Sequence, residues 1–130
     1  PHPGAAQGDS HGYFCWRECL TKNTDTAGAF YTNLFGYTAQ EMDMGEQGMY
    51  TMLMMGEMPV AGMMAMAPEW GEVPSHWGVY VTVNDVDKDT ERATALGAKI
   101  VVPPSDIPNM GRFSMLTGPT GVNFGIFAAL

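Results

Sequence analysis

The sequence repeats itself with a period of 61 residues, and this repeat limits the possible folds more than any other feature. The shift aligns three pairs of residues: Trp16 with Trp77, Asn23 with Asn84, and Gly36 with Gly97. Each half starts with a strand-like segment, YFCWRECL or HWGVYVTV, and continues into a helix-forming segment that ends at a glycine. Three more strand-like segments complete each half. Two copies of one supersecondary unit predict an α+β domain made of two βαβββ modules.

We expect a flexible N-terminal arm at residues 1–10, because this stretch has no apolar period, and one domain at residues 11–130. Its two modules should span about residues 12–68 and 74–129. In the first helix, capped by Asn23 or Thr24, the side chains of Ala29, Phe30 and Leu34 are expected to face the sheet. Asn84 or Asp85 should cap the second helix, and the acidic residues that follow favour its dipole.

Charge and length exclude several classes of partner. Six Lys and Arg against 14 Asp and Glu give a net charge of -8, which repels nucleic acid and anionic membrane surfaces. No segment approaches the roughly 20 apolar residues of a membrane-spanning helix, and the first residues do not resemble a signal peptide, so we expect a cytoplasmic protein. Cys15 and Cys19, about 13 Å apart in one strand, should be free thiols.

Four motifs carry a family resemblance, namely AFYTNLFGY, YVTVNDVD, ALGAKIV and GPTGVNFGIF. In this order and spacing they resemble the glyoxalase/bleomycin-resistance/dioxygenase superfamily, also called vicinal oxygen chelate, over about residues 12–128. The resemblance implies that each βαβββ module curls into half of an open barrel and that the two halves enclose a cavity. It also implies a homodimer.

The family's enzymes hold a divalent metal ion with side chains from the first, fifth and eighth strands. Counting from the helix caps and from Gly121, these ligand positions fall on Trp16, Gly78 and Gly125. An indole and two glycines cannot ligate a metal ion, so we predict no metal and no other cofactor. Glyoxalase and dioxygenase chemistry of the usual kind is therefore not expected.

The alternation of a strand predicts which side chains share the face of Trp16. The expected ligand-binding residues are Phe14, Trp16, Glu18, His76, Gly78, Tyr80, Asn123, Gly125 and Phe127. Trp77, Val79, Val81 and Val83 should pack beneath the helices. Ten of the 12 Met residues lie between Met42 and Met66, which suggests a pliable apolar wall, with a Cu(I) site as the weaker alternative.

Glu18 and His76 are the candidate catalytic residues. A carboxylate among apolar side chains either binds a cation or acts as a general base, or it is paired with an arginine such as Arg112. His76 either carries protons or is structural.

Three functions remain open. The first is metal-independent binding of a small apolar or cationic aromatic molecule. The second is an enzyme, a lyase, an isomerase or a ring-cleaving dioxygenase, that uses relocated ligands at Glu18, His76 and Asn123 or acid–base chemistry at Glu18 and His76. The third is a regulatory or partner module whose cavity is vestigial.

Overall fold

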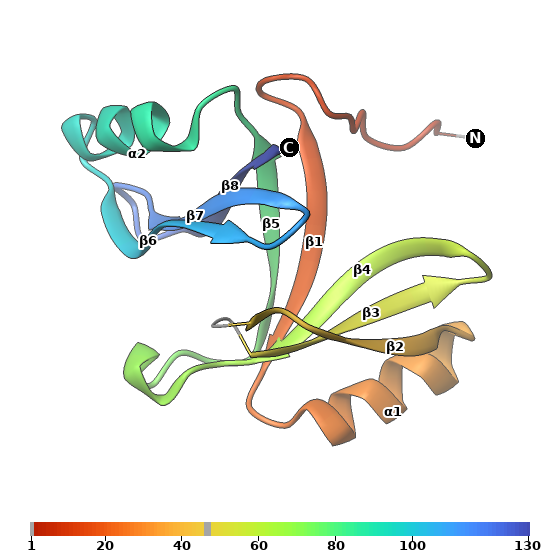
Figure 1. The fold of residues 1–130 in the computed structure, drawn as a ribbon. Coiled ribbons are helices and arrows are strands. Elements are labelled where there is room, and N and C mark those ends of the chain that lie inside the picture. Colours follow the sequence, from red (N-terminus) through yellow and green to blue (C-terminus); the bar gives the residue numbers. More distant parts are fainter. Residues whose placement is uncertain (1, 46–47) are drawn as a thin grey trace. The chain divides into compact units, whose positions relative to one another are not determined.

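A computed structural model describes residues 2–45 and 48–130, and the chain divides into two compact units. Unit 1 comprises Pro1–Cys15 and Val79–Leu130, and unit 2 comprises Trp16–Gly78. Of the expected N-terminal arm, Pro1 lies outside the described residues. The elements follow the predicted order of strand, helix and three strands, twice over (Figure 1), so the α+β fold of two βαβββ modules is confirmed.

Among the described residues, each half of the chain contributes four strands and one α-helix. The first half contains β1 (Phe14–Thr21), α1 (Thr24–Phe35), β2 (Thr38–Asp43), β3 (Met49–Met55) and β4 (Met58–Ala65). After a short 3-10 helix, η2 (Pro68–Trp70), the second half contains β5 (His76–Thr82), α2 (Val86–Ala95), β6 (Lys99–Ile107), β7 (Gly111–Thr117) and β8 (Asn123–Ala129). No helix among the described residues is long and apolar enough to cross a membrane.

In unit 2 the strands lie in the order β2-β3-β4-β1, with β1 parallel to β4 and the other pairs antiparallel. The helix α1 starts where the Asn23 side chain accepts a hydrogen bond from the backbone of Thr26, and it ends at Gly36 in the left-handed conformation. One face of the sheet packs against α1, because the Cα of Gly28 comes close to the end of the Met63 side chain.

The orientation expected for α1 is wrong. Ala29 is exposed, and Phe30 and Leu34 are each 57% exposed. The helix turns its small residues toward the sheet instead, where Gly28 permits a close approach to Met63. Tyr31 fixes this orientation, since its ring meets Trp77 edge-on at 5.0 Å and its hydroxyl accepts a hydrogen bond from the Trp77 indole at 3.1 Å.

In unit 1 the strands lie in the order β5-β8-β7-β6, again with the first strand parallel to the last. Val83, Val86, Leu116 and Ile126 form a buried cluster between α2 and the sheet. This burial was expected for Val83, whereas Val79, also expected beneath the helices, is exposed. Gly8 of the N-terminal arm bonds the backbone of Phe14 and accepts a hydrogen bond from the Thr82 hydroxyl. The flexibility of the arm therefore stays a prediction only.

The structure corrects the period of the repeat within the first strand of each half. Asp85 caps α2 as Asn23 caps α1, and these two residues are 62 positions apart. Trp16 therefore corresponds to Gly78 and Glu18 to Tyr80, whereas Trp77 packs against Tyr31 of α1. The offset is 61 residues at the glycines that end the helices, Gly36 and Gly97, because the path from cap to terminal glycine is one residue shorter in the second half.

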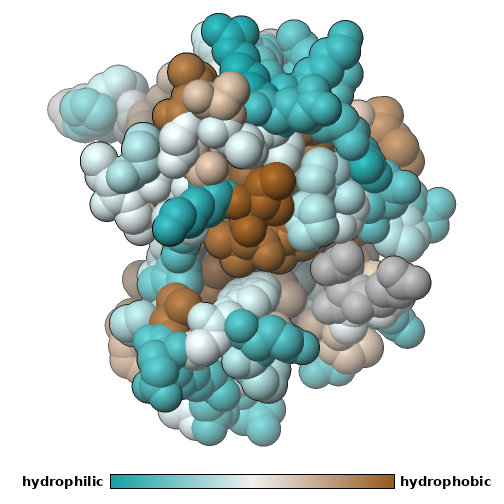
Figure 2. Space-filling model, turned by 90° about the vertical axis from the view of Figure 1, so that its left-hand side faces the viewer, coloured by the Kyte–Doolittle hydropathy of each residue, from teal (hydrophilic) through white to brown (hydrophobic). Residues whose placement is uncertain are grey.

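Apolar side chains also reach the surface. The exposed large residues include Phe30, Leu34 and Phe35 on α1 and Met55 and Met58 at the turn between β3 and β4. On the face drawn in Figure 2, hydrophobic residues gather in a patch bordered by hydrophilic ones. Patches of this kind are common at interaction sites. The expected homodimer remains a prediction that this exposure makes worth testing.

Candidate functional site

One face of the sheet of unit 2 packs against α1. The other face, which no helix among the described residues of unit 2 covers, gathers polar and sulfur-containing side chains. In the strand register Glu18 and Met52 both pair with Gly62, Leu20 pairs with Met64, and Met42 pairs with Tyr50. Met63, next to Gly62, points to α1. Alternation along the strands therefore places on one face Glu18, Leu20, Met42, Tyr50, Met52, Gly62 and Met64. We call this set the helix-free face.

A chain of two hydrogen bonds joins β3 to β1 across the helix-free face. The Tyr50 hydroxyl donates to the Glu18 carboxylate Oε2 over 2.6 Å and accepts a hydrogen bond from the Trp16 indole Nε1 over 2.8 Å. Glu18 is only 4% exposed, while Trp16 and Tyr50 are half-buried. A buried carboxylate is costly unless it is hydrogen-bonded, so Tyr50 stabilises the charged form of Glu18 in place.

Gly62 makes this arrangement possible. The Tyr50 ring reaches from β3 over the Cα of Gly62, and any Cβ at this position would overlap the ring and its hydroxyl. The sequence indicated Trp16 and Glu18 through strand alternation, but it gave no sign of Tyr50 or Gly62. Their role depends on the register of β3 and β4, which are distant from β1 in the sequence.

Behind Glu18, on the side of α1, lies Cys19. Burial raises the pKa of the Cys19 thiol, and the negative charge of Glu18 raises it further. Cys15 and Cys19 are both free, as the spacing predicted. The raised pKa disfavours the thiolate of Cys19, which is the reactive form of a cysteine.

His76 and Gly78, also in unit 2, precede the part of β5 that belongs to unit 1. The His76 ring is half-buried, and its Nδ1 lies 2.8 Å from the carbonyl oxygen of Pro74. Since a carbonyl can only accept, Nδ1 carries the proton and Nε2 is the basic nitrogen. Gly78 lies against Leu20, and a Cβ added at Gly78 would be 3.5 Å from a Leu20 methyl group.

The other expected ligand-binding residues lie in unit 1. Tyr80 pairs with Gly125, and its ring covers Gly125 so closely that a Cβ there would overlap it. Phe127 and Asn123 share the strand face of Gly125, and the Asn123 amide oxygen accepts a hydrogen bond from Thr117 over 2.6 Å. Phe14 is exposed at the start of β1. The structure thus groups Trp16 with Glu18 in one unit and Tyr80 with Gly125 in the other.

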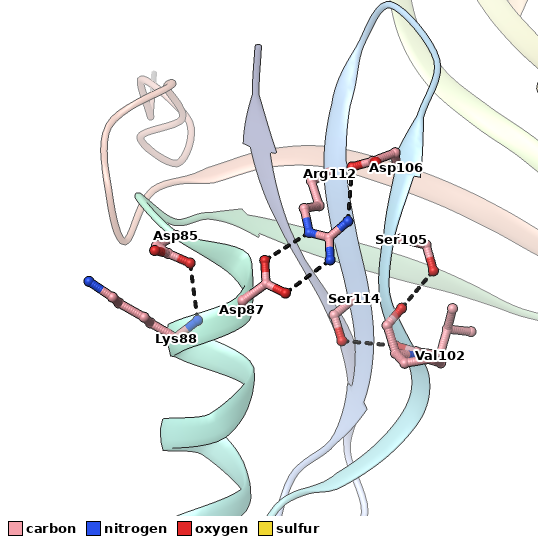
Figure 3. A network of polar contacts seen from close by, with 9 residues as sticks. Asp85, Asp87, Lys88, Val102, Ser105, Asp106, Arg112 and Ser114 are labelled. Carbon is pink, nitrogen blue, oxygen red and sulfur yellow. Dashed lines mark hydrogen bonds and ion pairs between the residues drawn. The ribbon is translucent and has the colours of Figure 1, made fainter.

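Arg112, the arginine considered as a partner for Glu18, has two carboxylates of its own (Figure 3). Its guanidinium holds Asp87 with two hydrogen bonds of 2.8 and 2.9 Å and Asp106 with one of 2.9 Å. The guanidinium lowers the pKa of Asp87. Asp85 next to it caps α2 by accepting the Lys88 backbone N–H. These contacts connect the start of α2 to β6 and β7, which is a structural role.

The three positions at which the resemblance places metal ligands do not fit a metal ion. The Trp16 indole donates to Tyr50, Gly78 has no side chain, and the Tyr80 ring fills the space in front of Gly125. Across residues 2–45 and 48–130, no three side chains of His, Cys, Asp or Glu converge as they would around an ion. The donor set therefore disagrees with the divalent centre that such folds usually hold.

Comparison with known proteins identifies the family of this chain. The model of the Glyoxalase/Bleomycin resistance protein/Dioxygenase superfamily matches residues 18–126. "Putative glyoxylase CFP32" of Mycobacterium tuberculosis is 37% identical over 125 residues, which cover 96% of this chain and 47% of that protein. The anthracycline biosynthesis protein DauV of Streptomyces sp. strain C5 is 27% identical, over 86% of this chain and 45% of its own length. The chain thus spans about half the length of these relatives.

Among solved structures, methylmalonyl-CoA epimerase from Mycobacterium tuberculosis matches with a TM-score of 0.63 at 15% identity. The match covers 98% of this chain and 94% of the epimerase. At this identity the likeness concerns the fold, and the side chains of the site must be judged from this chain alone.

Proposed function

Because this chain belongs to the Glyoxalase/Bleomycin resistance protein/Dioxygenase superfamily, we propose that it binds a small organic molecule on the helix-free face of unit 2, independently of a divalent metal ion. The observation that carries the proposal is the Glu18–Tyr50–Trp16 chain of hydrogen bonds, which holds a buried carboxylate beside two aromatic rings. A face of this composition suits a flat molecule with a positive charge or a hydrogen-bond donor.

The surroundings of Glu18 support an aromatic, preferably cationic, ligand. Met42, Met52 and Met64 share the helix-free face, and unbranched thioether side chains adapt to ligands of different shapes. An aromatic ring attracts a cation by roughly 0.5 to 2 kcal/mol, and a carboxylate with little access to water adds to this attraction. The net charge of -8 acts in the same direction at longer range.

The other ligand-binding residues expected from the sequence stay a separate proposal in each unit. These residues are His76 and Gly78 in unit 2, and Phe14, Tyr80, Asn123, Gly125 and Phe127 in unit 1. Alanine substitution of Phe14 and Asn123, which are both exposed, tests this group. The mass of the protein in solution tests dimer formation. Failure to bind any ligand would favour the third function, a regulatory or partner module.

The test compares two probes of the same shape, N-methylpyridinium, which is cationic, and toluene, which is neutral. Glu18→Gln keeps the volume but removes the charge, so it should weaken N-methylpyridinium binding about threefold to thirtyfold and leave toluene nearly unchanged, as measured by calorimetry. Glu57→Gln is the matched control, because Glu57 is exposed at the β3–β4 turn and its substitution changes the net charge equally. Equal losses of N-methylpyridinium affinity in both variants would mean that Glu18 acts only through its long-range charge and does not contact the ligand.

Trp16→Ala should weaken both probes, because the apolar contact serves either of them. Tryptophan fluorescence gives a second measurement. Trp70 and Trp77 also fluoresce, but Trp16→Phe should remove most of the change in fluorescence that the ligand causes. Stoichiometric zinc, iron or manganese in the purified protein, with a rise in melting temperature on adding the metal, would contradict metal independence.

A second function has one specific observation in its favour, the short 2.6 Å bond between Tyr50 and Glu18. A carboxylate with a tyrosine hydroxyl beside it can take a proton from a carbon acid, with His76 Nε2 as a further basic group in unit 2. Incorporation of deuterium from heavy water into a bound carbonyl compound, lost in Glu18→Gln, would establish proton transfer. Without such exchange the binding function stands alone.

A further inference from the structure

Tyr50 spans the helix-free face in an unusual direction for a strand residue. Its side chain starts on β3, lies over Gly62 on β4 and ends at Glu18 and Trp16 on β1. We infer that Tyr50 is a gate at the proposed binding site. Its hydroxyl occupies the place on Glu18 that the cationic or donor group of a ligand takes, so contact of that group with Glu18 requires displacement of the hydroxyl. This inference rests on the proposed function and adds the residue that sets ligand selectivity.

The first argument is the hydrogen-bonding capacity of the hydroxyl. A tyrosine hydroxyl has one proton, and here that proton goes to Glu18 Oε2 over 2.6 Å, while the oxygen accepts from the Trp16 indole over 2.8 Å. A ligand donor that approaches the same carboxylate oxygen competes directly with Tyr50. A neutral apolar ligand has no group to offer Glu18, so it gains nothing by displacing the hydroxyl.

The second argument is the reason for glycine at position 62. Gly62 does not have the left-handed φ at which glycine is favoured, so its backbone conformation suits any residue. What it provides is room, since a Cβ would overlap the Tyr50 ring and hydroxyl. Glycine in a strand normally weakens it, and its presence here is explained by the close approach of Tyr50.

A second Trp–Tyr pair in unit 2 provides a control for the gate. On the other side of the sheet, the Trp77 indole donates to the Tyr31 hydroxyl over 3.1 Å. This pair has the same donor and acceptor types, but Tyr31 belongs to α1 and the described contacts of its hydroxyl include no carboxylate. It therefore provides a control in which a tyrosine hydroxyl is removed without changing Glu18.

The experiment measures the affinities of N-methylpyridinium and toluene for the wild-type protein, Tyr50→Phe and Tyr31→Phe by calorimetry. Phenylalanine keeps the ring over Gly62 and removes only the hydroxyl. Tyr50→Phe should bind N-methylpyridinium about tenfold more tightly, which corresponds to about 1.4 kcal/mol, and toluene within twofold of the wild type. Tyr31→Phe should bind both probes like the wild type.

Gly62→Ala is the second variant, because an added methyl group should force Tyr50 away from Glu18 and raise cation affinity in the same way. Combined with Tyr50→Phe it should give no further gain, since both changes remove one hydrogen bond. The NMR signal of the Trp16 indole N–H gives an independent reading. It should move in Tyr50→Phe and, in the wild type, on adding N-methylpyridinium.

The outcomes separate the two proposals. If N-methylpyridinium binds to the wild type and Tyr50→Phe binds it equally or more weakly, Tyr50 is a ligand contact and the gate is excluded, while the binding function remains. If neither protein binds either probe, both proposals fail. If only Tyr50→Phe binds the cation, the gate is supported in its strongest form.

Discussion

The two units have the same order of elements but use the corresponding residues differently. Five positions before the helix cap, unit 1 has Tyr80, whose ring fills the space over Gly125, and unit 2 has Glu18, whose carboxylate accepts a hydrogen bond from Tyr50. The helices differ too, since α2 buries Val86 and Thr90 while α1 buries no residue. The comparison indicates that the same position in the repeat serves packing in unit 1 and a buried hydrogen-bond chain in unit 2.

The difference between the helices can be tested by truncating one leucine in each unit. Leu116 is 1% exposed in the cluster beneath α2, so Leu116→Ala should reduce the free energy of unfolding by about 2 to 5 kcal/mol. Leu34 is exposed on α1, and Leu34→Ala should change it by less than about 0.5 kcal/mol. Denaturant unfolding measures both at low protein concentration, where self-association is weak. Equal losses would mean that α1 is covered in solution.

The two glycines of the implied metal positions provide a second test. A Cβ at Gly125 overlaps the Tyr80 ring, whereas one at Gly78 makes an ordinary contact of 3.5 Å with Leu20. Gly125→Ala should therefore cost about 1 to 3 kcal/mol, and Gly78→Ala less than about 1 kcal/mol. Thermal and denaturant unfolding of the two variants compare them directly. A neutral Gly125→Ala would show that Tyr80 does not pack tightly on its strand partner.

Thiol labelling compares β1 at two positions, Cys15 in unit 1 and Cys19 in unit 2. Cys19 is buried and its pKa is raised, first by burial and then by the charge of Glu18, so little thiolate is present at neutral pH. Iodoacetamide should modify Cys15 at least about tenfold faster, as followed by mass spectrometry of peptides.

The raised pKa of Cys19 also makes the stability of the folded protein depend on pH. A thiol whose pKa is raised by folding stabilises the folded state below its ordinary pKa, and this contribution is lost as pH rises toward the raised value. Unfolding experiments in the alkaline range should therefore show a decline that Cys19→Ser reduces. Equal labelling of both cysteines would show that the strand opens readily at Cys19.

The smallest effect is expected at the ion pairs of Arg112. Arg112→Lys loses the two-pronged bond to Asp87 but keeps the charge, and exposed pairs contribute little, so the melting temperature should fall by only a few degrees. Because Arg112 lowers the pKa of Asp87, the contribution of this pair is present above the ordinary pKa of aspartate and lost as pH falls through the lowered one. The variant should therefore match the wild type in strong acid.

The fold was predictable because its signals are local. The caps Asn23 and Asp85, the glycines after the helices and the alternation in each strand all act within a few residues. The burial of α1 was not predictable, since its apolar residues lie around much of the helix and only the contacts of Gly28 and Tyr31 with distant strands select a side. The exact repeat shift failed for a similar reason, because one helix path is a residue shorter.

The sequence allowed prediction only of those site residues that lie on the first strand of each half. Alternation placed Trp16 and Glu18 on one face, and the structure connects them through Tyr50. Tyr50 could not be found, because its partners are more than 30 residues away and depend on the register of β3 on β4. The pairing of Arg112 was similarly hidden, since Asp87 and Asp106 come from α2 and β6.

The Tyr80 ring over Gly125 also constrains how this lineage can change. A glutamate or histidine at position 125 would restore one of the ligands implied by the family resemblance, but Tyr80 occupies the space that this side chain needs. The mutational path to a metal centre therefore requires a smaller residue at position 80 before, or together with, the new ligand. An engineer who wishes to install a metal ion should therefore begin at Tyr80.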